Sequence, residues 1–140
     1  MRILLLALGI VLMGCATSVE AVKKDEASIS GKTLEPGECG LYVWTADAAK
    51  TFTLFATPSE LNYFRDGETI SLTEKNPTRP PSSSREFFDP DGKSLALTLL
   101  SPQDIDGGRR FKAGRLTSLS DDGWEKVVPV VGLYACQPLV

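Results

Sequence analysis

The sequence contains no histidine, and this absence removes much of the common apparatus of enzyme chemistry. A Ser-His-Asp or Cys-His arrangement, a histidine general base and a His-ligated zinc are all excluded. Glycine-rich loops of the kind that cradle phosphate groups are absent as well. We therefore expect a protein that is not an enzyme, with no catalytic residue and no cofactor. A minimal hydrolase that uses aspartate or glutamate is the alternative.

The longest apolar run lies at the N-terminus, where Met1-Arg2 precedes an unbroken stretch of small and apolar residues from Ile3 to Met13. This stretch has the length of a signal-peptide core and is too short to span a bilayer. It ends in Leu12-Met13-Gly14-Cys15, which resembles a bacterial lipobox, although methionine is less common before the glycine than alanine or serine. The resemblance implies a signal peptide at 1–14 and acylation of Cys15.

Each methylene of an acyl chain contributes about 0.8 kcal/mol of membrane affinity, so two or three chains hold a protein on a membrane almost permanently. Ala16 follows the cysteine, and a residue other than aspartate there resembles the pattern of lipoproteins sent to the outer membrane. The sequence thus predicts a lipid anchor in the outer membrane, on its periplasmic side. An ordinary signal peptide with an incidental Cys15 is the alternative.

Cysteine is scarce, with three residues in the chain. If lipid occupies Cys15, only Cys39 and Cys136 are left to pair in an oxidising compartment. Each lies beside a Gly-Leu-Tyr triplet, at 40–42 and 132–134. We expect a disulfide that joins the first strand of the domain to the last, and two free thiols are the alternative.

The formal net charge of −3 is small. It argues against a nucleic-acid-binding surface and permits a cationic partner. Residues 15–38 are polar, mixed in charge and poor in large apolar side chains, so we expect them to form a lipidated, flexible tether. The segment 39–140 is long enough for a single domain with its own core.

Within that domain, apolar residues alternate with polar ones, most clearly in Thr69-Ile70-Ser71-Leu72-Thr73. This period is typical of strands with one buried face. Asp-Gly dipeptides favour tight hairpins. Four of them separate the apolar runs: Asp66-Gly67, Asp91-Gly92, Asp106-Gly107 and Asp122-Gly123. The sequence predicts an all-β domain, a small antiparallel meander or barrel of about seven to eight strands.

One segment conflicts with this pattern. Thr57-Pro58-Ser59-Glu60 has the order of a helix capping box, with proline at the first helical position. Leu61 and Phe64 then follow at helical spacing. We expect a short helix near 58–64, with an irregular strand as the alternative.

The segment 75–85 is the longest break between apolar runs and is rich in proline and serine. Lys75, Arg79 and Arg85 make it locally basic. Long loops on small β scaffolds often carry binding, so these three residues are the candidate binding residues. A linker without a binding role is the alternative.

Two segments, 89–92 and 104–107, match Asp-x-Asp-Gly and resemble a fragment of a calcium loop. Neither continues with the further ligands that calcium requires, so we interpret both as turns and expect no metal site. Trp44 and Trp124 are expected in the core, with a surface aromatic platform as the alternative.

Taken by its parts, the chain resembles a small bacterial envelope lipoprotein. The stretches 39–44 and 122–136 are similar to proteobacterial proteins without a known activity. Membrane-bound lysozyme inhibitors are similar in size, anchoring and β-barrel build, but their Ser-Gly-x-x-Tyr type motif has no counterpart in this sequence. We expect a non-enzymatic binding or structural role in the cell envelope, with an envelope protein or polymer as partner. The alternative is an inhibitor of a cationic envelope-attacking enzyme such as lysozyme.

Overall fold

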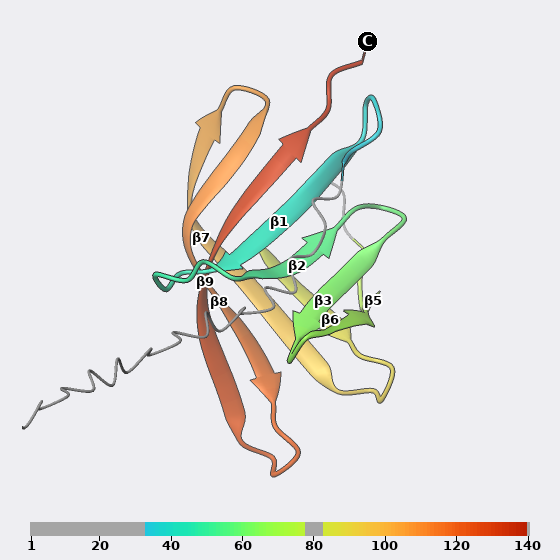
Figure 1. The fold of residues 1–140 in the computed structure, drawn as a ribbon, viewed down its shortest axis with the longest axis vertical. Helices are drawn as coiled ribbons and strands as arrows, with labels where there is room; N and C mark the ends of the chain where they lie inside the picture. Colours follow the sequence, from blue (N-terminus) through green and yellow to red (C-terminus); the bar gives the residue numbers. More distant parts are fainter. Residues whose placement is uncertain (1–32, 78–82, 140) are drawn as a thin grey trace, which may run out of the picture.

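The structure is a computed structural model that describes residues 33–77 and 83–139. The nine strands of this part of the chain are β1 (Cys39–Thr45), β2 (Phe52–Ala56), β3 (Leu61–Arg65), β4 (Glu68–Ser71), β5 (Thr73–Glu74), β6 (Ser84–Phe88), β7 (Ser94–Ile105), β8 (Gly108–Leu119) and β9 (Glu125–Cys136) (Figure 1). They form one antiparallel sheet in the order β4-β3-β2-β1-β9-β8-β7-β6-β5. The all-β prediction is confirmed, with nine strands rather than seven or eight.

The sheet curls into a nearly closed barrel. Its two outermost strands, β4 and β5, are consecutive in the chain and are joined by the single residue Leu72. The two edges of the sheet are therefore joined covalently through Leu72, and β4 and β5 are not paired with each other. We call the junction of β4 and β5 the seam.

Opposite the seam, the first and last strands pair along their whole shared length, from Cys39↔Cys136 to Thr45↔Val130. A disulfide joins Cys39 to Cys136, whose Cα atoms are 4.0 Å apart. The predicted closure of the domain by these two cysteines is confirmed. The two Gly-Leu-Tyr triplets lie side by side, since Leu41 is opposite Tyr134.

The four Asp-Gly dipeptides all lie in turns that connect neighbouring antiparallel strands, as predicted. Their glycines have φ angles of 79–80°, which residues with a side chain rarely adopt. A Cβ added at any of the four would meet no atom within 4 Å. Conformation rather than space therefore explains why glycine occupies these positions.

The prediction of a short helix near 58–64 is wrong, because the described residues contain no helix and Leu61 begins strand β3. The Thr57 hydroxyl does accept the Glu60 backbone N–H at 3.0 Å, as a helix cap would. The Thr57 N–H, however, donates to the Glu60 carbonyl at 2.7 Å and closes a tight β2–β3 turn. Pairing of β3 with strands on both sides outweighs the local helical signal.

The middle of the barrel is filled by apolar side chains from alternate strand positions. The buried set is Leu41, Val43, Leu54, Ala56, Leu72, Phe87, Leu95, Leu97, Leu99, Phe111, Leu116 and Val130. On β8, Phe111 and Leu116 have opposite parity, yet both point inward. An irregularity in the β8–β9 register between Phe111 and Arg115 allows this.

The barrel has two distinct ends. At the disulfide end lie the Cys39–Cys136 bridge and both ends of the described chain, where the Gly37 N–H donates to the Gln137 carbonyl at 2.9 Å. The β6–β7 and β8–β9 turns lie at the other end, which we call the distal end (Figure 1). Among residues 33–77 and 83–139, no helix has the length and hydropathy needed to cross a membrane.

Candidate functional site

A cavity of about 630 Å³ opens at the disulfide end of the barrel. Its apolar lining includes Leu41, Ala56, Leu61, Leu72 and Tyr134, which come from five different parts of the sheet. Pockets that hold small molecules typically measure about 300–1,000 Å³. The barrel is thus filled in its middle and hollow at the disulfide end, and we call this hollow the mouth cavity.

A charged pair also lines the mouth cavity. Arg85 Nε lies 2.7 Å from Glu74 Oε1, and Arg85 Nη2 lies 2.8 Å from Glu74 Oε2. Only 11% of the Arg85 side chain and 13% of the Glu74 side chain are exposed. A bidentate pair shielded from water in this way has strong directional hydrogen bonds, because the surrounding dielectric constant is lower than in water.

The position of this pair follows from strand register. Glu74 in β5 is opposite Phe87 in β6, and Arg85 lies two residues before Phe87 on the same face. The guanidinium carbon of Arg85 is 5.3 Å from the centroid of the Phe87 ring. Arg85 is therefore held from both sides, by a carboxylate and by an aromatic ring, and its orientation is fixed.

The rim of the mouth cavity is polar. The β2–β3 turn contributes Thr57, Ser59 and Glu60, and Glu38 lies directly before β1. The hydroxyl oxygens of Thr57 and Ser59 are 3.4 Å apart. The cavity therefore combines an apolar interior with hydrogen-bonding groups at its opening, an arrangement suited to a molecule with both apolar and polar parts.

No family model matches this chain, and no curated protein or solved structure matches it either.

The structure separates the candidate binding residues named from the sequence. Arg85 lines the mouth cavity, together with Pro77 from the same segment. Lys75 instead forms an exposed ion pair with Glu86, at 3.0 Å, and lies over the Phe88 ring. This hydrogen bond from Lys75 is the main reason that the pKa of Glu86 is lowered. Arg79 lies outside the described residues, as does the expected lipidation residue Cys15.

The two Asp-x-Asp-Gly segments form turns, as interpreted from the sequence. Asp89 Oδ1 accepts hydrogen bonds from the backbone N–H groups of Asp91 and Lys93, at 2.9 and 2.8 Å. These bonds stabilise the turn and explain why an aspartate occupies the first position of the segment 89–92. Residues 33–77 and 83–139 contain no group of three or more side chains placed to hold a metal ion.

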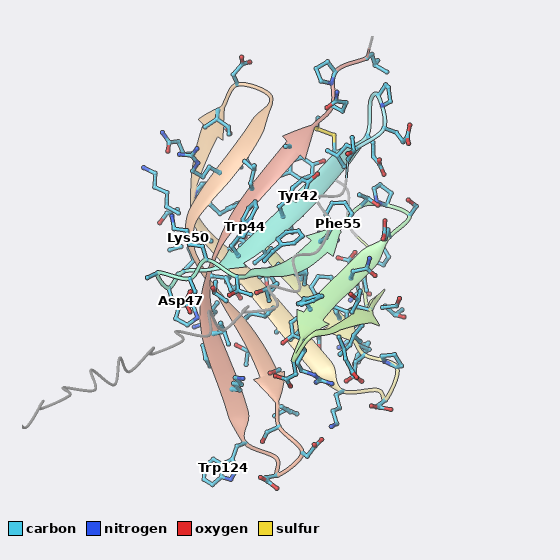
Figure 2. The ribbon with its side chains drawn as sticks, in the orientation of Figure 1. Tyr42, Trp44, Asp47, Lys50, Phe55 and Trp124 are labelled. Atoms are coloured by element: carbon cyan, nitrogen blue, oxygen red, sulfur yellow. A yellow bond between two sulfur atoms is a disulfide. The ribbon has the colours of Figure 1, made fainter. Side chains whose placement is uncertain are left out.

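Neither tryptophan lies in the barrel core, so that prediction is wrong for both. Trp44 belongs to an aromatic cluster on the outer face of β1 and β2, together with Tyr42, Phe52 and Phe55 (Figure 2). The centroids of neighbouring rings in this cluster are 5.1–6.0 Å apart. Burial raises the pKa of the Tyr42 hydroxyl, and Glu38 adds to this effect. Trp124 lies at the β8–β9 turn and is 77% exposed.

Proposed function

We propose that this chain is a lipid-anchored protein of the cell envelope that binds a small amphipathic molecule in the mouth cavity, without chemical turnover. One observation carries the binding part of this proposal. A cavity of about 630 Å³ with an apolar interior also contains a shielded, oriented Arg85–Glu74 pair. An apolar interior provides affinity by removing apolar surface from water, whereas a few fixed polar groups provide orientation.

The polar part of the ligand is expected to accept hydrogen bonds. A guanidinium group has five N–H donors. The pair with Glu74 uses Nε and Nη2 of Arg85, which leaves other N–H groups for an oxygen of the ligand. Because Glu74 offsets the positive charge of Arg85, an uncharged oxygen acceptor such as an ester, amide or hydroxyl suits the site better than a free anion.

The position of the cavity also supports an amphipathic ligand. The described chain begins at the disulfide end, where the mouth cavity opens. The proposed tether 15–38 leads to this same end, and a flexible chain of this length spans on the order of 25 Å. With the anchor at Cys15, the cavity lies within reach of molecules that leave the bilayer surface.

A cavity-filling variant tests the binding site. In Ala56→Phe, a ring enters the mouth cavity from a position that is 3% exposed, so we expect at least a tenfold loss of affinity for the apolar fluorescent probe 1-N-phenylnaphthylamine. The control is Ala113→Phe, which adds the same ring at an exposed position of β8. Fluorescence titration gives the affinity, and circular dichroism checks that each variant is folded.

A second cavity-filling variant, Leu61→Trp, enlarges the side chain at a half-buried position of the same cavity. It keeps the test valid if Ala56→Phe does not fold. The binding proposal fails if the wild-type chain does not bind the probe with saturation. It also fails if both folded variants bind the probe as tightly as Ala113→Phe does.

The anchor is tested separately in bacterial cells. We expect Cys15→Ser to move the protein from the membrane pellet to the soluble fraction, because the thiol that would receive the lipid is lost. Ala16→Ser retains Cys15 and serves as the control. Mass spectrometry of the purified proteins measures the acyl chains directly. Equal masses, apart from the substitutions, and equal membrane association for the two variants would contradict lipidation at Cys15.

A further inference from the structure

The β8–β9 hairpin exposes apolar side chains at the distal end. Five large apolar side chains of the described residues are at least half exposed, and three of them belong to this hairpin: Leu119 at 50%, Trp124 at 77% and Val127 at 53%. Leu119 is opposite Glu125 and Thr117 is opposite Val127, so Leu119 and Val127 share one face of the hairpin. Trp124 belongs to the turn that joins the two strands of the same hairpin (Figure 2).

The backbone holds this turn in one shape. The Ser120 N–H donates to the Trp124 carbonyl at 2.7 Å, and the Gly123 N–H donates to the Ser120 carbonyl at 3.0 Å. The Trp124 N–H also donates to Ser120 Oγ, at 3.1 Å. These bonds fix the backbone of Trp124, so docking of its ring costs the conformational entropy of the side chain but not that of the backbone, which suits an anchor residue.

A second contact joins the turn to its neighbour. Lys93 in the β6–β7 turn hydrogen-bonds and ion-pairs with Asp121. The interaction lowers the pKa of Asp121 and raises the pKa of Lys93, so both groups are charged at neutral pH. The β3–β4 turn lies at the distal end as well, because β3 begins beside Ala56 at the disulfide end and runs away from it. Arg65, beside this turn, contributes to the lowered pKa of Asp121.

The charge of these three turns is unbalanced. Their carboxylates are Asp66, Glu68, Asp89, Asp91, Asp121, Asp122 and Glu125, and their cationic side chains are Arg65, Lys93 and Lys126. The seven carboxylates and three cations give a net charge of −4. The rest of the described chain has eight carboxylates and seven cationic side chains, a net charge of −1. The apolar hairpin thus lies in the part of the described chain that holds most of its net negative charge.

We propose that the β8–β9 hairpin docks a second protein whose surface has an apolar pocket surrounded by basic side chains. Trp124 would fill the pocket, Leu119 and Val127 would cover its edge, and the carboxylates of the distal end would face the basic groups. Charge decides the class of partner, because a surface with a net charge of −4 is repelled by anionic lipid headgroups and attracts a basic protein. This docking surface is independent of the mouth cavity, and it matches the cationic partner raised as an alternative from the sequence.

The test uses the full chain carrying Cys15→Ser, so that no lipid contributes to binding. Three folded basic proteins serve as probes: lysozyme, ribonuclease A and cytochrome c. Poly-L-lysine and phosphatidylglycerol vesicles represent charge without a pocket and a lipid surface. We expect at least one basic protein to bind at low ionic strength. Trp124→Ala should weaken this binding at least tenfold, measured by biolayer interferometry.

Matched variants separate the aromatic anchor from the charge. Leu100→Ala removes an exposed apolar side chain from β7 and should leave binding unchanged. Asp122→Asn combined with Glu125→Gln should weaken binding severalfold and reduce its salt dependence, whereas Asp104→Asn combined with Asp106→Asn should not.

Four outcomes would overturn the proposal. In the first, none of the three basic proteins binds. In the second, Trp124→Ala binds them as tightly as the parent chain does. In the third, poly-L-lysine binds as tightly as the folded proteins, which would reduce the distal end to an acidic surface. In the fourth, the Trp124-dependent interaction is with the vesicles, which would make the hairpin a membrane contact.

Discussion

Removal of the Cys39–Cys136 disulfide is expected to lower the free energy of unfolding by about 3–5 kcal/mol. The two cysteines are 97 positions apart, so the bridge strongly restricts the unfolded chain. For a loop of about 100 residues, the chain-entropy model gives about 4.7 kcal/mol. The folded state should survive the loss, because seven residue pairs still hold β1 against β9. Urea unfolding of the wild type and of Cys39→Ala combined with Cys136→Ala measures the difference.

Chemical reduction provides the control for this prediction. A phosphine reductant should destabilise the wild type by a similar amount and leave the double alanine variant unchanged. The single variant Cys39→Ala should be as unstable as the double variant. If the oxidised wild type and the double variant have the same urea midpoint and slope, the closure of β1 on β9 does not depend on the bridge.

The substitution Phe87→Ala is expected to cost about 3–5 kcal/mol, because it leaves a cavity in a packed interior. Phe87 is fully buried, and it also supports the guanidinium of Arg85 from beneath. Its neighbour Phe88 offers a matched control, since it is the same residue type on the opposite face of β6 and is only half-buried. We expect Phe88→Ala to cost about 1 kcal/mol.

Urea titrations monitored by circular dichroism would give both values. A loss from Phe88→Ala that equals or exceeds the loss from Phe87→Ala would contradict the assignment of the inner and outer faces of β6. Destabilisation by Phe87→Ala without weaker binding of the fluorescent probe would show that Arg85 does not need this ring to serve the mouth cavity.

Much of the fold could be predicted because its causes are local. Alternation of apolar residues indicates strands, and Asp-Gly dipeptides indicate tight turns, whatever the rest of the chain does. The disulfide followed from the number of cysteines together with the lipobox resemblance. The capping sequence at 57–60 misled because its hydrogen bond from Glu60 to Thr57 is present, but in a turn between strands. Only the pairing of β3 with two neighbours decides between the two structures.

The candidate site was harder to predict because its causes are not local. Arg85 was singled out as one basic residue of a loop, yet its partner Glu74 lies just before that loop, and the lining residue Tyr134 comes from the last strand. Lys75 belongs to the same segment but points to the outside, where it meets Glu86. Strand register separates these two cations, and loop composition carries no information about register.

Trp124 shows a related difficulty. Tryptophan is usually buried, so its expected place was the core. Strands β8 and β9 have twelve residues each, however, whereas β3 and β4 have five and four. The long hairpin therefore extends past the barrel and takes its turn out of the interior. The excess length of these strands depends on pairing across the whole sheet, which no single segment of the sequence reveals.

The seam between β4 and β5 has a consequence for motion. These edge strands have four and two residues, and each is paired on one side only. Short, singly paired edges open locally at a much lower free energy than the long central strands do, and their amides exchange with solvent sooner. Leu72, the residue at the seam, also lines the mouth cavity. We therefore expect fluctuation of the seam to widen the cavity while β7, β8 and β9 stay paired. Under the proposed binding function, the weakest pairing in the sheet would then set the rate of ligand entry.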